Sequence, residues 1–266
     1  MGWAAAFGCL AGAMLVFPNQ AAESAKSALS LWASSVAPVL GPFMVCMLLI
    51  TSRLRGGLWF TGALGWLCGS PGGAKLMQGL RLSPAASLRG AALCGTMSPM
   101  FFLGTVSAWL KSPRAGRIIF LCHIAGAMLV GLCLPKERGG APASGAPLSL
   151  ADALRGSSLA LLSAALCMML GAAAGRMAEC AFPQLPPLLS AGLQCLLEVT
   201  NGVRKLIDVC PSNTPAWVCA VCSFGGLSII AQNAAVWQES GVSIGQLILI
   251  QMCHAAVSFF LCLLLA

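Results

Sequence analysis

One carboxylate lies near the centre of a predicted membrane span over about residues 187–206, where a charge is unfavourable unless it is paired or faces water. Glu198 is followed by Thr200, Asn201 and Gly202, and Asn and Gly can interrupt a helix and free backbone groups to bind a solute or an ion. The alternative is a neutral carboxyl that only forms a hydrogen bond with a neighbouring helix. We expect Glu198, Thr200 and Asn201 to contribute to a binding site.

A second charge within an apolar stretch is Lys75, which comes just after Ser70 and the glycine pair Gly72-Gly73. Its ammonium group is the natural counter-charge for Glu198 or for an anionic solute. The alternative is that the long side chain extends to the membrane interface. The favoured interpretation predicts that Lys75 and Glu198 share one polar cavity near mid-membrane.

Other polar groups lie at membrane depth. The hydroxyl groups of Thr96 and Ser98 stand beside a glycine and a proline in CGTMSP, residues 94–99, a composition typical of an unwound helix but also of a simple proline kink. Gln232 and Asn233 are expected to face the same cavity as Glu198. We interpret the isolated His123 and His254 as hydrogen-bonded structural residues rather than ligands.

Two segments carry the same S-x-G-G pattern, at residues 70–73 and 223–226. Paired glycines in mid-segment would leave backbone groups without partners in lipid. A re-entrant helical hairpin solves this, so we expect two hairpins, with tips at Gly72-Gly73 and at Ser223, Gly225 and Gly226. The alternative is a kinked full span. The matching context favours an internal duplication.

The composition requires these elements to lie in a bilayer. Charged residues make up 8% of the 266 positions and hydrophobic residues 58%, too many for one core to bury. The sequence predicts an all-α integral membrane protein with about seven transmembrane helices plus the two hairpins. That topology places ten of the 15 basic residues on the side of Arg53, which predicts a cytoplasmic location for that side and for the N-terminus.

Several functional classes are unfavoured. The basic residues behind the net charge of +8 lie scattered between spans, which argues against nucleic-acid binding. None of the common catalytic motifs is present, so we expect no enzyme. The 14 cysteines include many within apolar runs and are interpreted as small hydrophobic residues. A Gly, Pro and Ser-rich connector over residues 136–150 is expected to separate membrane halves over residues 1–135 and 151–266.

Four motifs in order resemble the sporulation integral membrane proteins of the YlbJ type, which contain nucleoside recognition or Gate domains. Residues 69–76 (GSPGGAKL) resemble that family's G-aromatic-P-x-G-A-K signature, and residues 31–43 (LWASSVAPVLGPF) its L-W-x(3)-V-x-P-x-L-x-P-F segment. Residues 197–202 (LEVTNG) resemble its L-E-x-T-x-G, and residues 223–228 (SFGGLS) its S-F-G-G-L-S. The resemblance runs from about Ala28 to the C-terminus.

The resemblance implies a fold related to concentrative nucleoside transporters and movement of a small polar or anionic solute, dipicolinate-like or nucleoside-like, in a spore-forming bacterium. The cell membrane, or a forespore membrane, is the implied location, with a coupling proton or sodium ion rather than a metal or organic cofactor. A membrane scaffold of a sporulation complex is the alternative, and homo-oligomerisation stays open. The implied site residues are Gly72, Gly73, Lys75, Glu198, Thr200, Asn201, Ser223, Gly225, Gly226 and Gln232. Two departures, Ser70 in place of an aromatic residue and Gly95-Thr96 in place of two asparagines, put the solute in question.

Overall fold

The structure is a computed structural model that describes residues 2–53, 57–80, 82–135, 147–210 and 212–266. Within these residues it contains helices and loops and no strand, which confirms the all-α class. Most of the expected connector, residues 136–146, lies outside the described residues. Five described helices are long and apolar enough to cross a membrane: Pro18–Arg53, Pro113–Cys133, Leu150–Ala181, Thr214–Ser240 and Ile244–Leu265.

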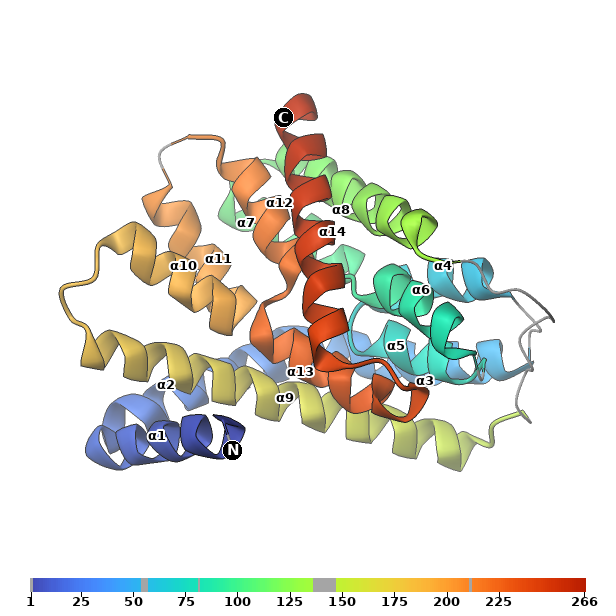
Figure 1. The fold of residues 1–266 in the computed structure, drawn as a ribbon, viewed down its shortest axis with the longest axis horizontal. Coiled ribbons are helices and arrows are strands. Elements are labelled where there is room, and N and C mark those ends of the chain that lie inside the picture. The colour runs from blue at the N-terminus through green and yellow to red at the C-terminus, as the bar shows by residue number, and fades with distance from the viewer. Residues whose placement is uncertain (1, 54–56, 81, 136–146, 211) are drawn as a thin grey trace.

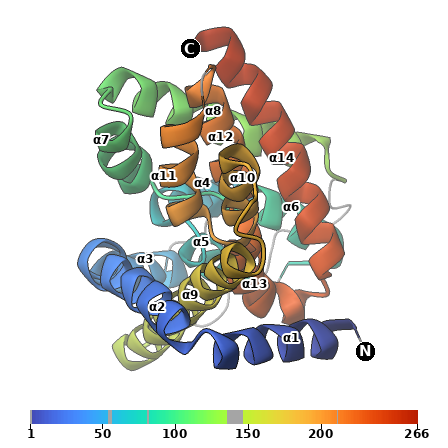
Figure 2. The ribbon, with the colours of Figure 1, turned by 90° about the vertical axis from the view of Figure 1, so that its left-hand side faces the viewer.

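The base of the molecule consists of the N-terminal helices, within residues 2–53, and one long helix from the second half of the chain (Figure 1). Helix α1 (Gly2–Val16) ends before Pro18, which starts α2 (Pro18–Leu31) and lacks the N–H that would continue α1. The π-helical turn η1 (Trp32–Val36) joins α2 to α3 (Ala37–Arg53) without a loop. Helix α9 (Leu150–Ala181) packs along α2 and α3 in the opposite direction. Figure 2 shows this layer edge-on.

The first helical hairpin consists of α4 (Leu58–Cys68) and α5 (Gly72–Gln78), which pack on each other. A Cβ atom on Gly73 would come within 3.0 Å of the Gly65 carbonyl oxygen, so the two glycines allow the limbs to touch. The tip lies at residues 69–71, where Gly69 has a φ of 67°. A helical hairpin therefore forms near the predicted place, but Gly72-Gly73 lies in α5 rather than at its tip.

A second helical hairpin consists of α10 (Pro187–Leu197) and α11 (Val199–Val209), with Glu198 in extended conformation between them. Gly202 in α11 lies directly against the backbone of Cys195 in α10, and a Cβ atom there would overlap Cys195 Cα and N. The sequence predicted a single span over this segment. That prediction is wrong, because the chain reverses at Glu198 (Figure 1).

Two further helices are broken rather than folded back. Helix α6 (Pro84–Cys94) ends at Gly95, and the chain resumes as the π-helical η2 (Phe101–Val106) and α7 (Ser107–Trp109). Helix α12 (Thr214–Phe224) is followed by α13 (Gly226–Trp237) and the 3-10 turn η3 (Gln238–Ser240).

The predicted second hairpin is wrong, because α13 packs on α9, α5, α10 and α14 instead of returning along α12. Gly225 and Gly226 both have positive φ, at 80° and 72°, and they redirect the helix without reversing it. Thr214–Ser240 is therefore a kinked helix long and apolar enough to cross a membrane, as in the alternative that the sequence left open.

Two unbroken helices, α8 and α14, pack on each other and on the broken helices. Helix α8 (Pro113–Cys133) packs on α14 (Ile244–Leu265), and both contact α12 and α6. Each begins at a serine cap: the hydroxyl of Ser112 accepts from the N–H of Ala115, and that of Ser243 accepts from the N–H of Gln246. The caps fix where α8 and α14 begin.

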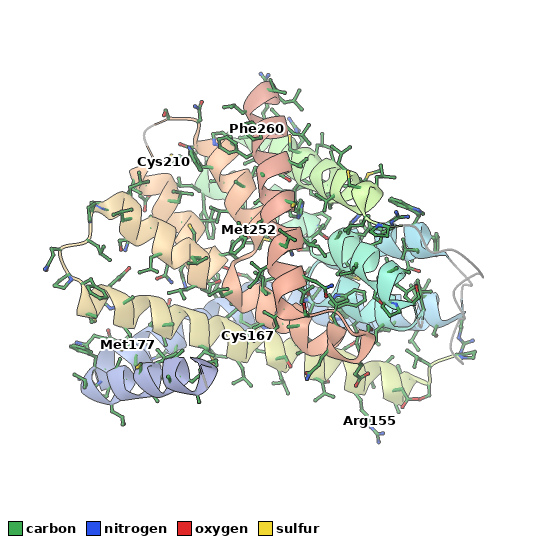
Figure 3. The ribbon with its side chains drawn as sticks, in the orientation of Figure 1. Arg155, Cys167, Met177, Cys210, Met252 and Phe260 are labelled. Carbon is green, nitrogen blue, oxygen red and sulfur yellow. The ribbon has the colours of Figure 1, made fainter. Side chains whose placement is uncertain are left out.

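The outer surface is apolar, as lipid requires. Leu159, Leu162 and Leu166 on α9 are 68%, 56% and 65% exposed. Met252 and Phe260 lie on the outer face of α14, and Arg155 marks one end of α9 (Figure 3). A water-soluble protein rarely exposes such a contiguous apolar surface, so these residues contact the bilayer.

One basic residue, Lys205, does not lie at the end of the molecule where the predicted topology placed it. Lys205 Nζ lies 2.5 Å from Glu179 Oε1, at the end of α9 that also carries Arg176. The predicted topology counted Lys205 among the ten basic residues on the Arg53 side, whereas Arg53 ends α3 at the opposite end of the molecule (Figure 1). Lys205 therefore does not belong with the basic residues that the predicted topology counted on the Arg53 side.

Candidate functional site

One cavity of about 640 Å³ gathers the tips of both hairpins and the chain next to both helix breaks. Its polar lining includes Ser70 from the first tip, Ser98 from the first break, Glu198 and Thr200 from the second tip, and Ser228 and Gln232 from α13. Apolar side chains of α3, α4, α9 and η2, among others, form most of the remaining lining. The volume is in the range of small-molecule sites.

The first hairpin tip is held on the first break by backbone contacts. The Ser70 N–H donates to the Thr96 carbonyl oxygen at 2.7 Å, and the Ser70 hydroxyl donates to the Cys94 carbonyl oxygen at 3.2 Å. Gly69 lies so close that a Cβ atom on it would approach Ser98 N to 2.5 Å. The hairpin therefore provides the hydrogen bonds that the interrupted helix α6 lacks.

The second tip lies against the second break in the same way. The Glu198 carboxylate accepts the N–H of Thr200 at 2.8 Å and of Asn201 at 2.9 Å, so it caps α11. A Cβ atom on Gly226 would approach the Cys195 carbonyl oxygen to 2.9 Å. Each oxygen of Glu198 accepts one of these bonds and has one further lone pair.

Three buried polar atoms near these contacts have no hydrogen-bond partner within the described residues: Thr96 Oγ1, Ser228 Oγ and Asn233 Oδ1. The Asn233 side chain is oriented by its amide nitrogen, which donates to Ser70 Oγ at 3.2 Å. Buried polar groups without partners are unfavourable by about 1–3 kcal/mol each. A polar solute in the cavity would reduce that penalty at Ser228, which lines it.

Lys75 does not line the cavity with Glu198 as expected. Its ammonium group donates to Gln78 Oε1 at 2.8 Å, and Gln78 in turn donates to Glu239 Oε2 at 3.0 Å. The ion pairs found among the described residues do not include Lys75 with Glu198. Glu198 is thus the only charged residue in the described lining, and the expected positive charge for an anionic solute is missing there.

The remaining predicted residues do not line the cavity, and they lie in the helix contacts and helix breaks around it. Gly72 and Gly73 pack α5 against its neighbours, and Thr96 lies in the first break with its carbonyl bound to Ser70. Asn201 is in the first turn of α11. Gly225 and Gly226 form the second break, and Ser223 just before it forms a hydrogen bond with His123 at 2.8 Å.

Sequence reasoning missed two polar residues around this site, Ser228 and Gln251. Ser228 lies on α13, one helical turn before Gln232. Asn233 was expected to face the cavity together with Gln232, and it contacts the cavity residue Ser70 without lining the cavity itself. Gln251 on α14 donates to the Gly95 carbonyl oxygen at 2.9 Å. A buried glutamine in an apolar span is itself the signal that was available for Gln251, because a polar group at membrane depth needs a partner.

Comparisons with known proteins give one relative and no fold match. The chain is 26% identical over 149 residues to "Sporulation integral membrane protein YlbJ" of Bacillus subtilis, an alignment that covers 47% of this chain and 36% of the relative. The chain thus spans about a third of the length of that curated relative. No family model matches the chain, and no solved structure matches it.

Proposed function

We propose that this chain is a membrane transporter or gate for a small polar solute. The observation that supports it best is the single cavity that collects two hairpin tips and two helix breaks. Interrupted helices at membrane depth are tolerated where they are buried in protein or line a water-filled cavity, and they are a recurrent way of building transporter sites. A scaffold has no need for Glu198 at such a place.

The order of elements supports a duplicated arrangement. Each half has a hairpin, a broken helix and an unbroken helix, in the order α4–α5, α6–α7, α8 and again α10–α11, α12–α13, α14. From the broken helices onward the halves align without gaps at a spacing of 131 residues, pairing Pro84 with Pro215, Gly95 with Gly226, Ser112 with Ser243 and His123 with His254. This pairing replaces the S-x-G-G echo as the basis of the repeat.

The repeat predicts hairpins that enter the membrane from opposite sides, because α6–α7, α8 and α9 cross between them. Single cysteines at positions 57 and 82, in a chain without its native cysteines, are expected to react with impermeant reagents from one side. Cysteines at positions 186 and 212 are expected to react from the other side. Labelling of 57 and 82 from opposite faces would mean that α4–α5 is a full span.

The solute that fits the cavity best is polar and carries no net negative charge. Glu198 is the only charged residue in the described lining, and hydroxyl and amide groups supply the other polar contacts. A nucleoside-like molecule suits these groups better than the dicarboxylate dipicolinate, which would meet the Glu198 carboxylate without a compensating cation. The similarity to a sporulation membrane protein supports a spore-forming cell as the setting.

Uptake into proteoliposomes tests the proposal. We expect saturable uptake of a labelled nucleoside, with dipicolinate a poor competitor. Gln232→Leu is expected to reduce uptake about tenfold, since it removes one buried polar contact. The matched control is Gln184→Leu, in the exposed turn between α9 and α10. Absence of uptake for all solutes, together with stoichiometric co-purification of a partner, would favour the scaffold instead.

A further inference from the structure

Two buried histidine rings meet where α8 crosses α14, one from each half of the chain. The ring centroids of His123 and His254 lie 4.7 Å apart with an interplanar angle of 37°, and both residues are fully buried. Gly126 makes room for them, because a Cβ atom there would lie 3.1 Å from His254 Cδ2 and would overlap the Ser258 hydroxyl. The two helices therefore approach each other closely at this pair.

His254 belongs to a chain of three polar contacts whose two ends are both carbonyl oxygens. The His254 Nε2 atom lies 2.8 Å from the His123 carbonyl oxygen, and its Nδ1 lies 3.3 Å from Gln251 Oε1. The Gln251 amide nitrogen donates to the Gly95 carbonyl oxygen at 2.9 Å. A carbonyl oxygen only accepts, so the ring and the amide between them must supply three donors.

A neutral His254 ring leaves this chain one donor short. A neutral imidazole has one N–H, and a carboxamide presents its N–H to one neighbour and its oxygen to the other. Either tautomer of the ring and either orientation of the amide gives two donors for three contacts, so two acceptors face each other somewhere. A protonated ring has two N–H groups and satisfies all three contacts.

His123 differs from its partner in this respect. Its Nε2 accepts the backbone N–H of Met97 at 3.0 Å, and its Nδ1 contacts the Ser223 hydroxyl, which can accept from it. A neutral ring with its proton on Nδ1 satisfies both contacts. Two adjacent rings disfavour two positive charges, so the pair suits one charged and one neutral ring.

The surroundings of His254 set burial against the hydrogen-bond requirement. Four helices pack against α14, and three of them carry titratable groups. These groups are Arg114, Arg117, Cys122, His123 and Cys133 on α8, Cys219 and Cys222 on α12, and Arg89 and Cys94 on α6. Helix α13 carries no titratable group. Arg89 is engaged with the Leu134 carbonyl oxygen at the end of α8. Burial opposes a charge on His254, and the carbonyl oxygens favour it. Opposed terms of this kind suit a proton that binds and leaves.

We propose that His254, between Gln251 and the His123 carbonyl group, binds one exchangeable proton and couples it to the first helix break. The proton completes the hydrogen bonds that tie α14 to Gly95, next to Met97 and Ser98, which line the cavity. A Cβ atom on Gly95 would overlap the Gln251 amide nitrogen, so the contact depends on glycine there. The coupling rests on the proposed transport function, whereas the proton site does not.

Nitrogen-15 NMR of the full chain in nanodiscs tests the proton site, because the chain has only two histidines to label. At about pH 7 we expect one imidazolium ring and one neutral ring protonated on Nδ1. His254→Gln should remove the imidazolium signals. Gln251→Leu should turn them into neutral-ring signals, because the ring then has one acceptor to serve, and Gln251→Glu should retain them to higher pH.

The control for these variants is Met252→Leu, on the lipid-facing side of α14 (Figure 3), which should leave the spectrum unchanged. Two neutral rings in the unaltered chain between about pH 5 and about pH 8 would overturn the proton site, whether or not any variant folds. A Gln251→Leu spectrum identical to that of the unaltered chain would overturn the role of the amide.

Uptake driven by a pH gradient tests the coupling separately. For one coupled proton, a gradient of about one pH unit should raise solute accumulation about tenfold, and His254→Gln should abolish that increase while solute exchange continues. An imidazolium signal combined with uptake that ignores the gradient would overturn the coupling and keep the site. Absence of uptake with the signal present would count against the transport function and not against proton binding.

Discussion

Glu198→Gln is expected to reduce uptake about a hundredfold while the protein still inserts and folds. A hydrogen bond to a charged group contributes about 1.5–3 kcal/mol, which corresponds to about 10-fold to 100-fold in affinity. The glutamine keeps one carbonyl oxygen for the N–H groups of Thr200 and Asn201, so only part of the cap is lost, at about 1 kcal/mol. Uptake and the midpoint of thermal unfolding in detergent measure the two effects.

Glu198→Asp separates the binding role from the capping role. Aspartate is among the best residues for starting a helix, so α11 should stay stable. Its side chain is one methylene shorter, which withdraws the carboxylate from the cavity and should still impair uptake. Glu239→Gln is the control, since Glu239 is exposed and contacts Gln78 outside the cavity. Full uptake by well-inserted Glu198→Gln would reduce Glu198 to a helix cap.

Gly202→Ala is expected to destabilise the protein by about 3 kcal/mol or more, the largest effect for a single methyl group in the second hairpin. The added Cβ atom overlaps backbone atoms of Cys195, which cannot move aside as a side chain would. The limbs α10 and α11 must then separate, and Glu198 at the tip must shift. Expression, the unfolding midpoint in detergent and uptake should all fall.

Gly192→Ala is the matched control in the same hairpin. No atom lies within 4 Å of the position that its Cβ would take. Alanine favours a helix over glycine by about 1 kcal/mol, so this variant should be as stable as the unaltered chain or more stable. Equal changes in the unfolding midpoints of the two variants would contradict the close approach of Gly202 to Cys195.

The long apolar helices could be predicted because lipid allows few alternatives to a helix. The position of the second hairpin could not be predicted from its local pattern. Gly225 and Gly226 do interrupt a helix as expected, but the direction of α13 after them depends on packing against α9, α5 and α14. The reversal at Glu198 depends on the close contact between Gly202 and Cys195. A single glycine in an apolar segment does not indicate which other helix it will pack against.

Part of the candidate site could also be predicted from the sequence, and part could not. Glu198, Ser70, Ser98, Thr200 and Gln232 were selected as polar groups at membrane depth, and the structure brings them to one cavity. The pairing of Lys75 with Glu198 rested on opposite charge alone. Gln78, three residues further along the chain, provides Lys75 with a nearer partner, and sequence offers no means of ranking a local partner against a distant one.

Helix α9 lines the cavity, and its apolar segment matches the hydrocarbon thickness of a bilayer. The apolar segment between Arg155 and Arg176 rises about 30 Å at about 1.5 Å per residue, which equals the hydrocarbon thickness of a typical membrane. A thinner bilayer would make α9 tilt, and a thicker one would draw both guanidinium groups toward hydrocarbon. Since Ala164 and Met168 of this helix line the cavity, hydrophobic mismatch would act directly on the shape of the binding site.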